Sequence, residues 1–250
     1  MRSQEEVDLV LEHLRQGRTA SEAARITGIP RSTVRDWRDG RSLHLPRSTA
    51  LGCIGHDFAA LEGAAYAYLL GMYLGDGCLS EQRRGVWRLR ITLDAAYPGI
   101  IAECASAIES VLPGKRGGLY ARRDARAIDV SSYWKHWPCL FPQHGPGPKH
   151  RRPIELTDWQ GRIVGAYVKQ FLRGLIHSDG TRIVATERKG AYVRRAPRYA
   201  FRNRSDDILE IFRRGCELAG VHCTRASPTQ IAVYSKTAVA RLDEFVGPKR

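Results

Sequence analysis

The sequence predicts an α+β protein that is built from two similar halves and preceded by a small all-α helix-turn-helix domain. A repeat indicates the halves: LLGMYLGDG at residues 69–77 returns as LRGLIHSDG at residues 172–180, and strand and helix patterns follow each copy. Two short amphipathic helices on either side of a glycine indicate the N-terminal domain. We place the helix-turn-helix at residues 1–45, a linker at 46–62, the first half at 63–150 and the second half at 151–250.

Charge and composition narrow the choice of partner. The chain of 250 residues is 43% hydrophobic, which is typical of a folded globular protein, and it carries a net charge of +14 with a pI near 9.9. A protein with this excess of positive charge is expected to meet a polyanion, and nucleic acid is favoured over a membrane surface. The chain shows no signal-peptide layout and no apolar stretch long enough to cross a bilayer, so we expect a cytoplasmic protein that does not contact membranes.

The N-terminal segment shows the pattern of three short helices. An apolar stripe predicts a first helix over residues 5–15. Ser21 is placed to cap a second helix, and Gly28 supplies the turn that ends it. Pro30 then stands at the opening of a third helix over residues 31–39, which completes a helix-turn-helix.

The third of these helices is the one expected to enter the major groove of DNA. Val34 and Trp37, one turn apart, face the interior of the domain and leave a polar face outward. The residues of that outward face, predicted to contact DNA, are Arg31, Ser32, Thr33, Arg35 and Arg38. Residues 1–45 hold eight Arg and seven acidic residues, so we expect the rest of the chain to make most of the electrostatic contact.

Each half contains a strand with one basic and one apolar face. Alternation in RLRITL (residues 88–93) and RYAFRNR (residues 198–204) separates arginines from apolar side chains. The arginines predicted to contact DNA are Arg88 and Arg90 in the first half and Arg198, Arg202 and Arg204 in the second. A helix follows each strand, and Ile128 and Ile231, equally far from the repeated aspartates, open a later strand.

The repeated segments predict two helices that pack on each other, one over residues 64–75, which carry no charge, and its partner over residues 166–178. Each contains two small residues one turn apart, which let helix backbones approach closely: Gly71 and Gly75 in the first, Gly174 and Ser178 in the second. The two helices should therefore form the seam between the halves.

Both helices stop at Asp-Gly, where Gly77 and Gly180 are expected to adopt the left-handed conformation. Close packing brings Asp76 and Asp179 together, although each carboxylate at a helix C-terminus costs roughly 0.3 to 1 kcal/mol and the two repel. A divalent cation reverses both effects. We therefore predict a site for Mg²⁺ or Mn²⁺ made by the carboxylates of Asp76 and Asp179 and the backbone carbonyls of Gly75 and Ser178.

The two segments that end in Asp76 and Asp179 resemble the paired motifs of monomeric LAGLIDADG homing endonucleases, and the resemblance extends over residues 63–250. It implies a pseudo-twofold pair of αββαββα halves that form a saddle on double-stranded DNA and meet through the motif helices. It also implies a monomer that hydrolyses one phosphodiester bond in each strand, with metal ions held by the two aspartates.

The resemblance further implies a basic residue, supplied by a late strand, that orders the attacking water. Lys236 in VYSKTA matches this role in the second half. Tyr133 occupies the corresponding position of the first half, with Lys135 two residues further on, so the first half departs from the family pattern.

Two other segments carry candidate polar residues. His177, beside the second aspartate, is a metal ligand or a packing histidine, and packing is favoured. The Pro/Gly-rich FPQHGPGPKHRRP is interpreted as the connector between the halves, with Lys149, Arg151 and Arg152 in contact with phosphates.

Three functions are compatible with this sequence. A site-specific DNA endonuclease is favoured, because a protein that only binds DNA has no need for clustered carboxylates that face phosphate. The main alternative is a transcription regulator that keeps the LAGLIDADG scaffold for binding alone. An RNA maturase that assists intron splicing is a third interpretation.

Overall fold

The computed structural model describes residues 4–38, 58–114, 117–123, 125–189, 192–247 and 249. The chain divides into two compact units, Met1–Gly55 and His56–Arg250. Most of the predicted linker, at residues 46–57, lies outside the described residues, as does Asp39 at the predicted end of the third helix.

The smaller unit is a three-helix bundle with α1 (Gln4–Arg15), α2 (Ala20–Thr27) and α3 (Arg31–Arg38). Val34 and Trp37 are buried in its core, as predicted, and Gly28 takes the left-handed conformation at the end of α2 with φ 70°. The predicted cap at Ser21 was wrong. Thr19 caps α2 through a reciprocal pair with Glu22, in which each residue's backbone N–H donates to the other's side chain.

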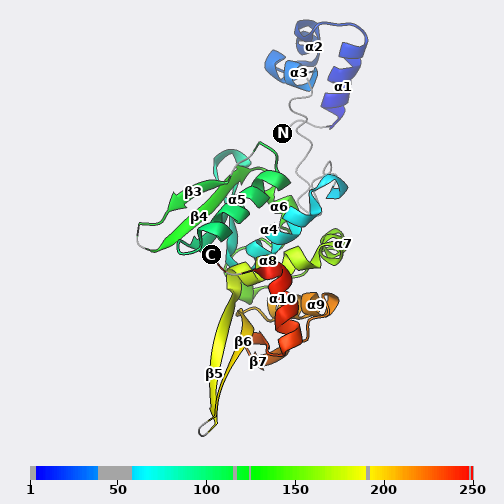
Figure 1. Cartoon of the computed structure of the whole chain (residues 1–250). Coiled ribbons are helices and arrows are strands. Elements are labelled where there is room, and N and C mark those ends of the chain that lie inside the picture. The colour runs from blue at the N-terminus through cyan, green and yellow to red at the C-terminus, as the bar shows by residue number, and fades with distance from the viewer. Residues whose placement is uncertain are drawn as a thin grey trace. The chain divides into compact units, whose positions relative to one another are not determined.

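The larger unit contains two halves with the same order of elements, αββαββα, which confirms the predicted fold class (Figure 1). The first half consists of α4 (Gly63–Asp76), β1 (Gly77–Glu81), β2 (Trp87–Asp94), α5 (Pro98–Val111), β3 (Gly118–Ala121), β4 (Ala127–Trp134) and α6 (Trp137–Leu140). The second consists of α8 (Val168–Asp179), β5 (Gly180–Lys189), β6 (Tyr192–Arg202), α9 (Asp206–Leu218), β7 (Thr224–Ser227), β8 (Gln230–Val233) and α10 (Lys236–Val246). The short 3₁₀ helices are Phe58–Ala60, Arg83–Gly85 and Lys149–Arg151, and α7 (Asp158–Ala166) joins the halves.

Each half has a four-stranded antiparallel sheet, with strand orders β1-β2-β4-β3 and β5-β6-β8-β7. The alternation predicted for the basic strands is confirmed. On β2, Leu89, Ile91 and Leu93 are buried, while the residues that alternate with them stay partly exposed, namely Arg88, Arg90 and Thr92. On β6, Phe201 stacks on Phe212 of α9, with ring centroids 4.3 Å apart. The apolar face of each sheet thus lies in the core, and the opposite face carries the arginines.

The two halves differ in the length of their hairpins. Gly77 pairs with Ile91 in the first half, whereas Gly180 pairs with Phe201 in the second. The β5–β6 hairpin is therefore longer, and Figure 1 shows it extending well beyond its sheet. The predicted match of Ile128 with Ile231 was wrong. The hairpin is longer in the second half and the connection from β6 to β8 is shorter, so the two isoleucines lie equally far from the aspartates without occupying equivalent positions.

The helix predicted over residues 166–178 is broken at its start. Tyr167, with φ −124° and ψ 42°, ends α7, and α8 begins at Val168. The Tyr167 ring lies against Gly63 at the start of α4, where a side chain on the glycine would collide with it. Among the described residues, no helix is both long enough and apolar enough to cross a membrane.

Candidate functional site

The seam between α4 and α8 positions the site, and glycines make the seam possible. A Cβ on Gly71 would lie 2.5 Å from the Phe171 carbonyl oxygen, and a Cβ on Gly174 would collide with the Tyr68 carbonyl. Real Cβ atoms do not make such contacts, so the backbones approach this closely only because both positions lack a side chain. The predicted close packing of the two motif helices, α4 and α8, is confirmed.

The glycines after the aspartates serve a different purpose from the one predicted. Gly77 has φ −88° and ψ 151°, and Gly180 has φ −97° and ψ 160°, so both are extended rather than left-handed. The chain passes directly from each motif helix into a strand. A Cβ on Gly77 would lie 2.5 Å from Tyr73 Cα, and one on Gly180 would lie 2.7 Å from Ile176 Cα. Glycine is required because the strand folds back tightly against its own helix.

The carboxylates of Asp76 and Asp179 meet at the end of the seam. A Cβ on Gly75 would lie 3.1 Å from Asp179 Oδ2, which shows how near the second aspartate comes to the first helix. Burial raises the pKa of Asp76 to about 6, and repulsion from Asp179 adds to this rise. Burial also raises the pKa of Asp179, although a 2.7 Å hydrogen bond from Asn203 Nδ2 opposes this rise. The protein thus holds two partly desolvated carboxylates together at an energetic cost.

Two lysines approach the pair from equivalent places in the two halves. Lys149 Nζ donates hydrogen bonds to the carbonyls of Tyr73, Leu74 (3.0 Å) and Gly75 (3.1 Å) at the end of α4. Lys249 Nζ donates to the carbonyl of His177 at 2.9 Å and more weakly to that of Ser178 at 3.5 Å, at the end of α8. Each lysine therefore supplies positive charge at the partly negative end of a motif helix.

Burial and the carboxylates act on these lysines in opposite directions. Burial lowers the pKa of Lys149 to about 8, while attraction to Asp179 and Asp76 opposes the fall. Burial also lowers the pKa of Lys249, and attraction to both aspartates and to Asp94 opposes it. At neutral pH Lys149 is mostly charged.

A firmly anchored loop delivers Lys149 to the site. Arg152 donates from Nη2 to the Gln143 carbonyl at 3.1 Å and from Nη1 to the Gly147 carbonyl at 2.6 Å. Arg152 therefore organises the loop, and these bonds occupy part of the guanidinium that we expected to contact phosphates. Gln143 is in turn held by a hydrogen bond to the Glu155 carbonyl at 2.7 Å.

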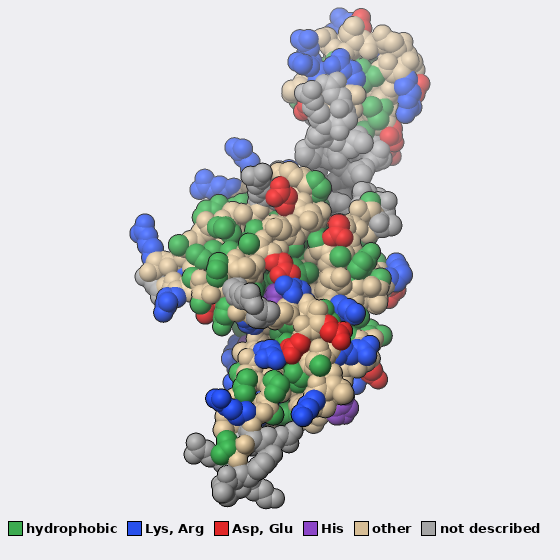
Figure 2. Space-filling model, in the orientation of Figure 1, with side chains coloured by type: hydrophobic (Ala, Val, Ile, Leu, Met, Phe, Trp, Pro, Cys, Tyr) green, Lys and Arg blue, Asp and Glu red, His purple; other side chains and the backbone are tan. Residues whose placement is uncertain are grey.

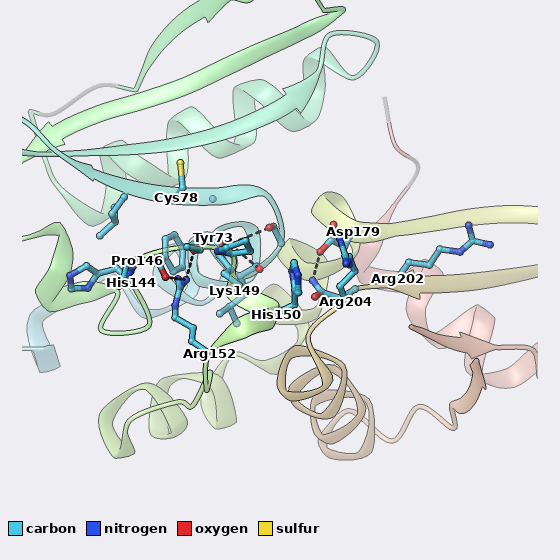
Figure 3. Close-up of a pocket in the computed structure, with 18 residues that line it drawn as sticks. Tyr73, Cys78, His144, Pro146, Lys149, His150, Arg152, Asp179, Arg202 and Arg204 are labelled. Carbon is cyan, nitrogen blue, oxygen red and sulfur yellow. Dashed lines mark hydrogen bonds between the residues drawn. The ribbon is translucent and has the colours of Figure 1, made fainter. Parts of the chain in front are cut away.

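A pocket of about 680 Å³ opens between this loop, the start of β1 and the end of β6. Figure 3 shows Lys149 and His150 on the loop with Asp179 and Arg204 beside them, whereas the Arg202 side chain extends away along its strand. Polar and charged side chains of its lining include Lys149, His150, Arg152, Asp179, Asn203 and Arg204. The pocket suits a phosphate group, because cationic side chains and an amide line it beside the Asp179 carboxylate.

The basic residue predicted for catalysis was misplaced. Lys236 does not lie on a strand but opens helix α10, where it is exposed, and it does not line the pocket. Tyr133 lies on β4 and Lys135 follows that strand's end. A repeated signal marks the residues that do approach the carboxylates: Gly-Pro-Lys stands at residues 147–149 and again at 247–249. Strand patterns do not reveal this repeat, because both lysines lie beyond the last helix of a half.

The other predicted site residues lie in three places. On α3, Arg31, Ser32, Arg35 and Arg38 are exposed and Thr33 is half-buried. On the sheets, Arg88, Arg90 and Arg198 are half-buried. Arg88 is also engaged within the fold, with a 2.8 Å hydrogen bond to Ser131 Oγ and an ion pair with Asp129 at 3.7 Å. Arg202 and Arg204 are exposed at the pocket.

His177 is a packing residue, as favoured from the sequence. Its side chain is buried, Nε2 donates to the Val246 carbonyl at 3.1 Å, and Nδ1 accepts from the Tyr68 hydroxyl at 3.0 Å. Burial and nearby Arg173 lower the pKa of His177 to about 4, so the ring is neutral at physiological pH. Both ring nitrogens are engaged, and neither is free to bind a metal.

Comparisons with known proteins found one family model and several solved structures that are similar to this chain. Residues 8–41 match the model of a helix-turn-helix domain family. Among solved structures, the chain is similar to the N-terminal LAGLIDADG domain of DUF199/WhiA, with 15% identity and a TM-score of 0.45 over 79% of this chain and 87% of that one. It is also similar to the LAGLIDADG meganuclease I-AabMI bound to uncleaved DNA, with 11% identity and a TM-score of 0.46 over 72% and 82% of the chains.

A third similar structure is the I-SmaMI LAGLIDADG homing endonuclease bound to cleaved DNA, with 8% identity and a TM-score of 0.46 over 73% and 83% of the chains. No curated protein matches the chain. These similarities are too low to indicate a function.

The donors at the seam fit a hard divalent cation. Two carboxylates are present, and the carbonyls of Gly75 and Ser178, although they accept hydrogen bonds from lysines, each retain a second lone pair. In the described part of the chain no three His, Cys, Asp or Glu residues form a cluster that could hold a metal ion. A cation at Asp76 and Asp179 would therefore complete its shell with backbone carbonyls, water and substrate oxygens.

Proposed function

We propose that this chain is a site-specific DNA endonuclease that requires Mg²⁺ or Mn²⁺ and hydrolyses phosphodiester bonds in both strands of double-stranded DNA. The observation that carries the proposal is the juxtaposition of Asp76 and Asp179 at the end of a seam that only glycines permit. Burial raises the pKa of both carboxylates, and Asp179 further raises that of Asp76, so the pair destabilises the fold and a ligand of opposite charge would explain its presence.

The two carboxylates and the residues around them would each have a role in such a reaction. Asp76 and Asp179 would hold the metal, which when bound activates water and stabilises charge on the phosphate and the leaving oxygen. Lys149 and Lys249 would present ammonium groups to phosphate oxygens, and they keep the ends of α4 and α8 in place through their hydrogen bonds to backbone carbonyls. The arginines of the sheets and of α3 would bind the DNA backbone and bases.

A regulator that binds DNA without cutting it is the second candidate, and one observation favours it. Lys149 already donates to the Gly75 carbonyl, and both lysines lie close enough to attract the carboxylates. In a regulator, this arrangement would neutralise the pair internally and leave no role for a cation.

Cleavage of a randomised DNA library distinguishes the two candidates. The full chain is incubated with the library under Mg²⁺ and under Mn²⁺, and the DNA ends and the bound DNA are both sequenced. The nuclease proposal predicts cut ends at a shared sequence that disappear in Asp76→Asn and Asp179→Asn while binding persists. Glu244→Gln, the same chemical change on the exposed face of α10, is the control and should cut normally. Bound but uncut DNA under both metals would contradict the nuclease and support the regulator.

A further inference from the structure

The sheet registers define which residues of the two halves are equivalent near the carboxylates. Gly77 follows Asp76 and pairs with Ile91, while Gly180 follows Asp179 and pairs with Phe201. Continuing from these anchors, the matched positions are Thr92 with Arg202, Leu93 with Asn203, and Asp94 with Arg204. The two halves thus carry different chemistry at three consecutive positions beside the site.

The second-half residues favour an anionic ligand and support their aspartate. Asn203 Nδ2 donates to Asp179 Oδ2 at 2.7 Å, and the Arg204 side chain is exposed at the pocket that also contains Lys149. Figure 3 shows Arg204 and His150 beside Asp179. A phosphate entering this pocket meets cationic side chains and a carboxylate already oriented by an amide.

The first-half residues offer the opposite environment. Leu93, at the position of Asn203, is buried and has no donor for Asp76. Asp94, at the position of Arg204, is exposed, accepts a hydrogen bond from the Ala96 backbone N–H at 2.9 Å, and is close enough to Lys249 to act on its charge. A phosphate on this side would therefore meet Lys249 together with a third carboxylate.

The neighbouring strand repeats the difference. Thr92 Oγ1 donates to Asp129 Oδ1 at 2.8 Å, whereas the equivalent Arg202 Nε donates to Gln230 Oε1 at 2.7 Å. Asp129 and Gln230 occupy matching positions opposite these residues. The first half therefore places acidic groups where the second half has arginine and a neutral amide.

We infer that the two DNA strands are cut at unequal rates, and that the strand whose scissile phosphate enters the Lys149–Asn203–Arg204 pocket is cut first. This inference rests on the proposed nuclease function. Its physical basis is the attraction of phosphate to one side and the repulsion by Asp94 on the other. The enzyme would release a nicked duplex before a double-strand break, with roughly a tenfold difference between strands, equivalent to about 1.4 kcal/mol in activation free energy.

Strand-resolved cleavage kinetics test the inference. The randomised duplex library carries a different adapter at each end, so that cuts in each strand are sequenced separately over time. The expected result is one fast and one slow strand. Asp94→Arg should accelerate the slow strand several-fold, and Arg204→Asp should slow the fast strand by a similar factor. Glu217→Arg, a matched charge reversal on the exposed surface of α9, should leave both rates unchanged.

Different results contradict the strand preference and the nuclease function on which it rests. Equal rates in the wild type, or Asp94→Arg and Arg204→Asp acting on both strands alike, contradict the strand preference and leave the nuclease intact. If neither strand is cut under either metal, the nuclease function is contradicted, and the strand preference is contradicted as well.

Discussion

Asp76 is the residue at which the proposed function and the stability of the fold are most directly opposed. Its pKa is raised from an ordinary value of 3.8 to about 6, mainly by burial and next by Asp179. The folded state therefore binds this proton more tightly than the unfolded state does. The carboxyl group makes the fold most stable below pH 4 and progressively less stable as the pH rises through 6.

Replacing this carboxylate should stabilise the protein when no divalent metal is present. We expect Asp76→Asn to raise the free energy of unfolding at pH 7.5 by about 1–2 kcal/mol, because the amide removes a desolvated charge. Denaturant unfolding in EDTA measures this change. The gain should vanish at pH 4, and adding Mg²⁺ should stabilise the wild type more than the variant. A loss of stability at pH 7.5 would contradict the electrostatic account.

Lys149 is expected to matter for cleavage, and Lys236 is not. Lys149→Met keeps much of the side-chain volume but removes the ammonium group that reaches the end of α4, so the cleavage rate should fall about 10²-fold or more. Lys236→Met, at an exposed helix start, is the matched control and should change the rate little. Single-turnover kinetics on the recovered target compare the two variants. A larger effect at Lys236 would restore the assignment made from the sequence.

The seam between α4 and α8 shows how close packing fixes the site at the level of elements. Because Gly71 and Gly174 face backbone atoms of the partner helix, a methyl group cannot be accommodated without separating the helices. Gly71→Ala should therefore lower the free energy of unfolding by about 3 kcal/mol. Gly161→Ala in α7, where a Cβ meets nothing within 4 Å, is the control and should raise stability by about 0.5–1 kcal/mol. Thermal unfolding that ranks the two variants equally would count against the tight seam.

The elements and their faces could be predicted from the sequence, whereas their connections could not. The repeat and its small residues predicted the motif helices, and alternation predicted the basic strands, since side-chain burial in a strand follows directly from spacing. The equal distances of Ile128 and Ile231 from the aspartates suggested a wrong register. The longer hairpin and the shorter later connection of the second half nearly offset each other along the chain. Gly77 was assigned a left-handed turn from local chemistry alone. Its real constraint is the contact with Tyr73 Cα, which depends on the tertiary path.

Within the site, the sequence predicted the pair of aspartates, whereas Lys149 was predicted only to contact phosphates and Lys249 was not predicted at all. The motif repeat marks Asp76 and Asp179 directly, because each stands before the final glycine of a repeated segment. Lys149 lies on a loop whose course depends on side-chain hydrogen bonds such as those of Arg152 to the Gln143 and Gly147 carbonyls, which no periodic pattern indicates. Only the repeated Gly-Pro-Lys at residues 147–149 and 247–249 signals their equivalence.

At the level of the whole molecule, the larger unit does not concentrate its positive charge on the side that its helices cover. On the face shown in Figure 2, over which α5 and α10 lie in Figure 1, Lys and Arg are mixed with acidic and hydrophobic side chains. The described arginines predicted to contact DNA belong instead to α3, to the polar sheet faces and to the pocket. We therefore expect DNA to bind on the sheet side of the larger unit and along α3.

This distribution predicts a strong dependence of DNA affinity on salt. The dissociation constant should rise with a slope of about 0.9 per phosphate contact on a log–log plot, because each contact releases a counterion. Arg35→Ala on α3 should reduce that slope and weaken binding without changing the single-turnover rate on saturated DNA. Fluorescence anisotropy over a salt series provides both values. A flat salt response would contradict binding through arginines and lysines.

The most direct test of the central claim is to locate a divalent cation relative to the carboxylate pair. Crystals of the full chain bound to DNA and grown with Mn²⁺ should show an anomalous scattering peak within coordination distance of Asp76 and Asp179. Crystals of the Asp76→Asn, Asp179→Asn double variant should show none. If the wild-type complex instead places Lys149 and Lys249 against the carboxylates with no manganese between them, the pair is neutralised internally and the protein is a DNA-binding scaffold rather than a nuclease.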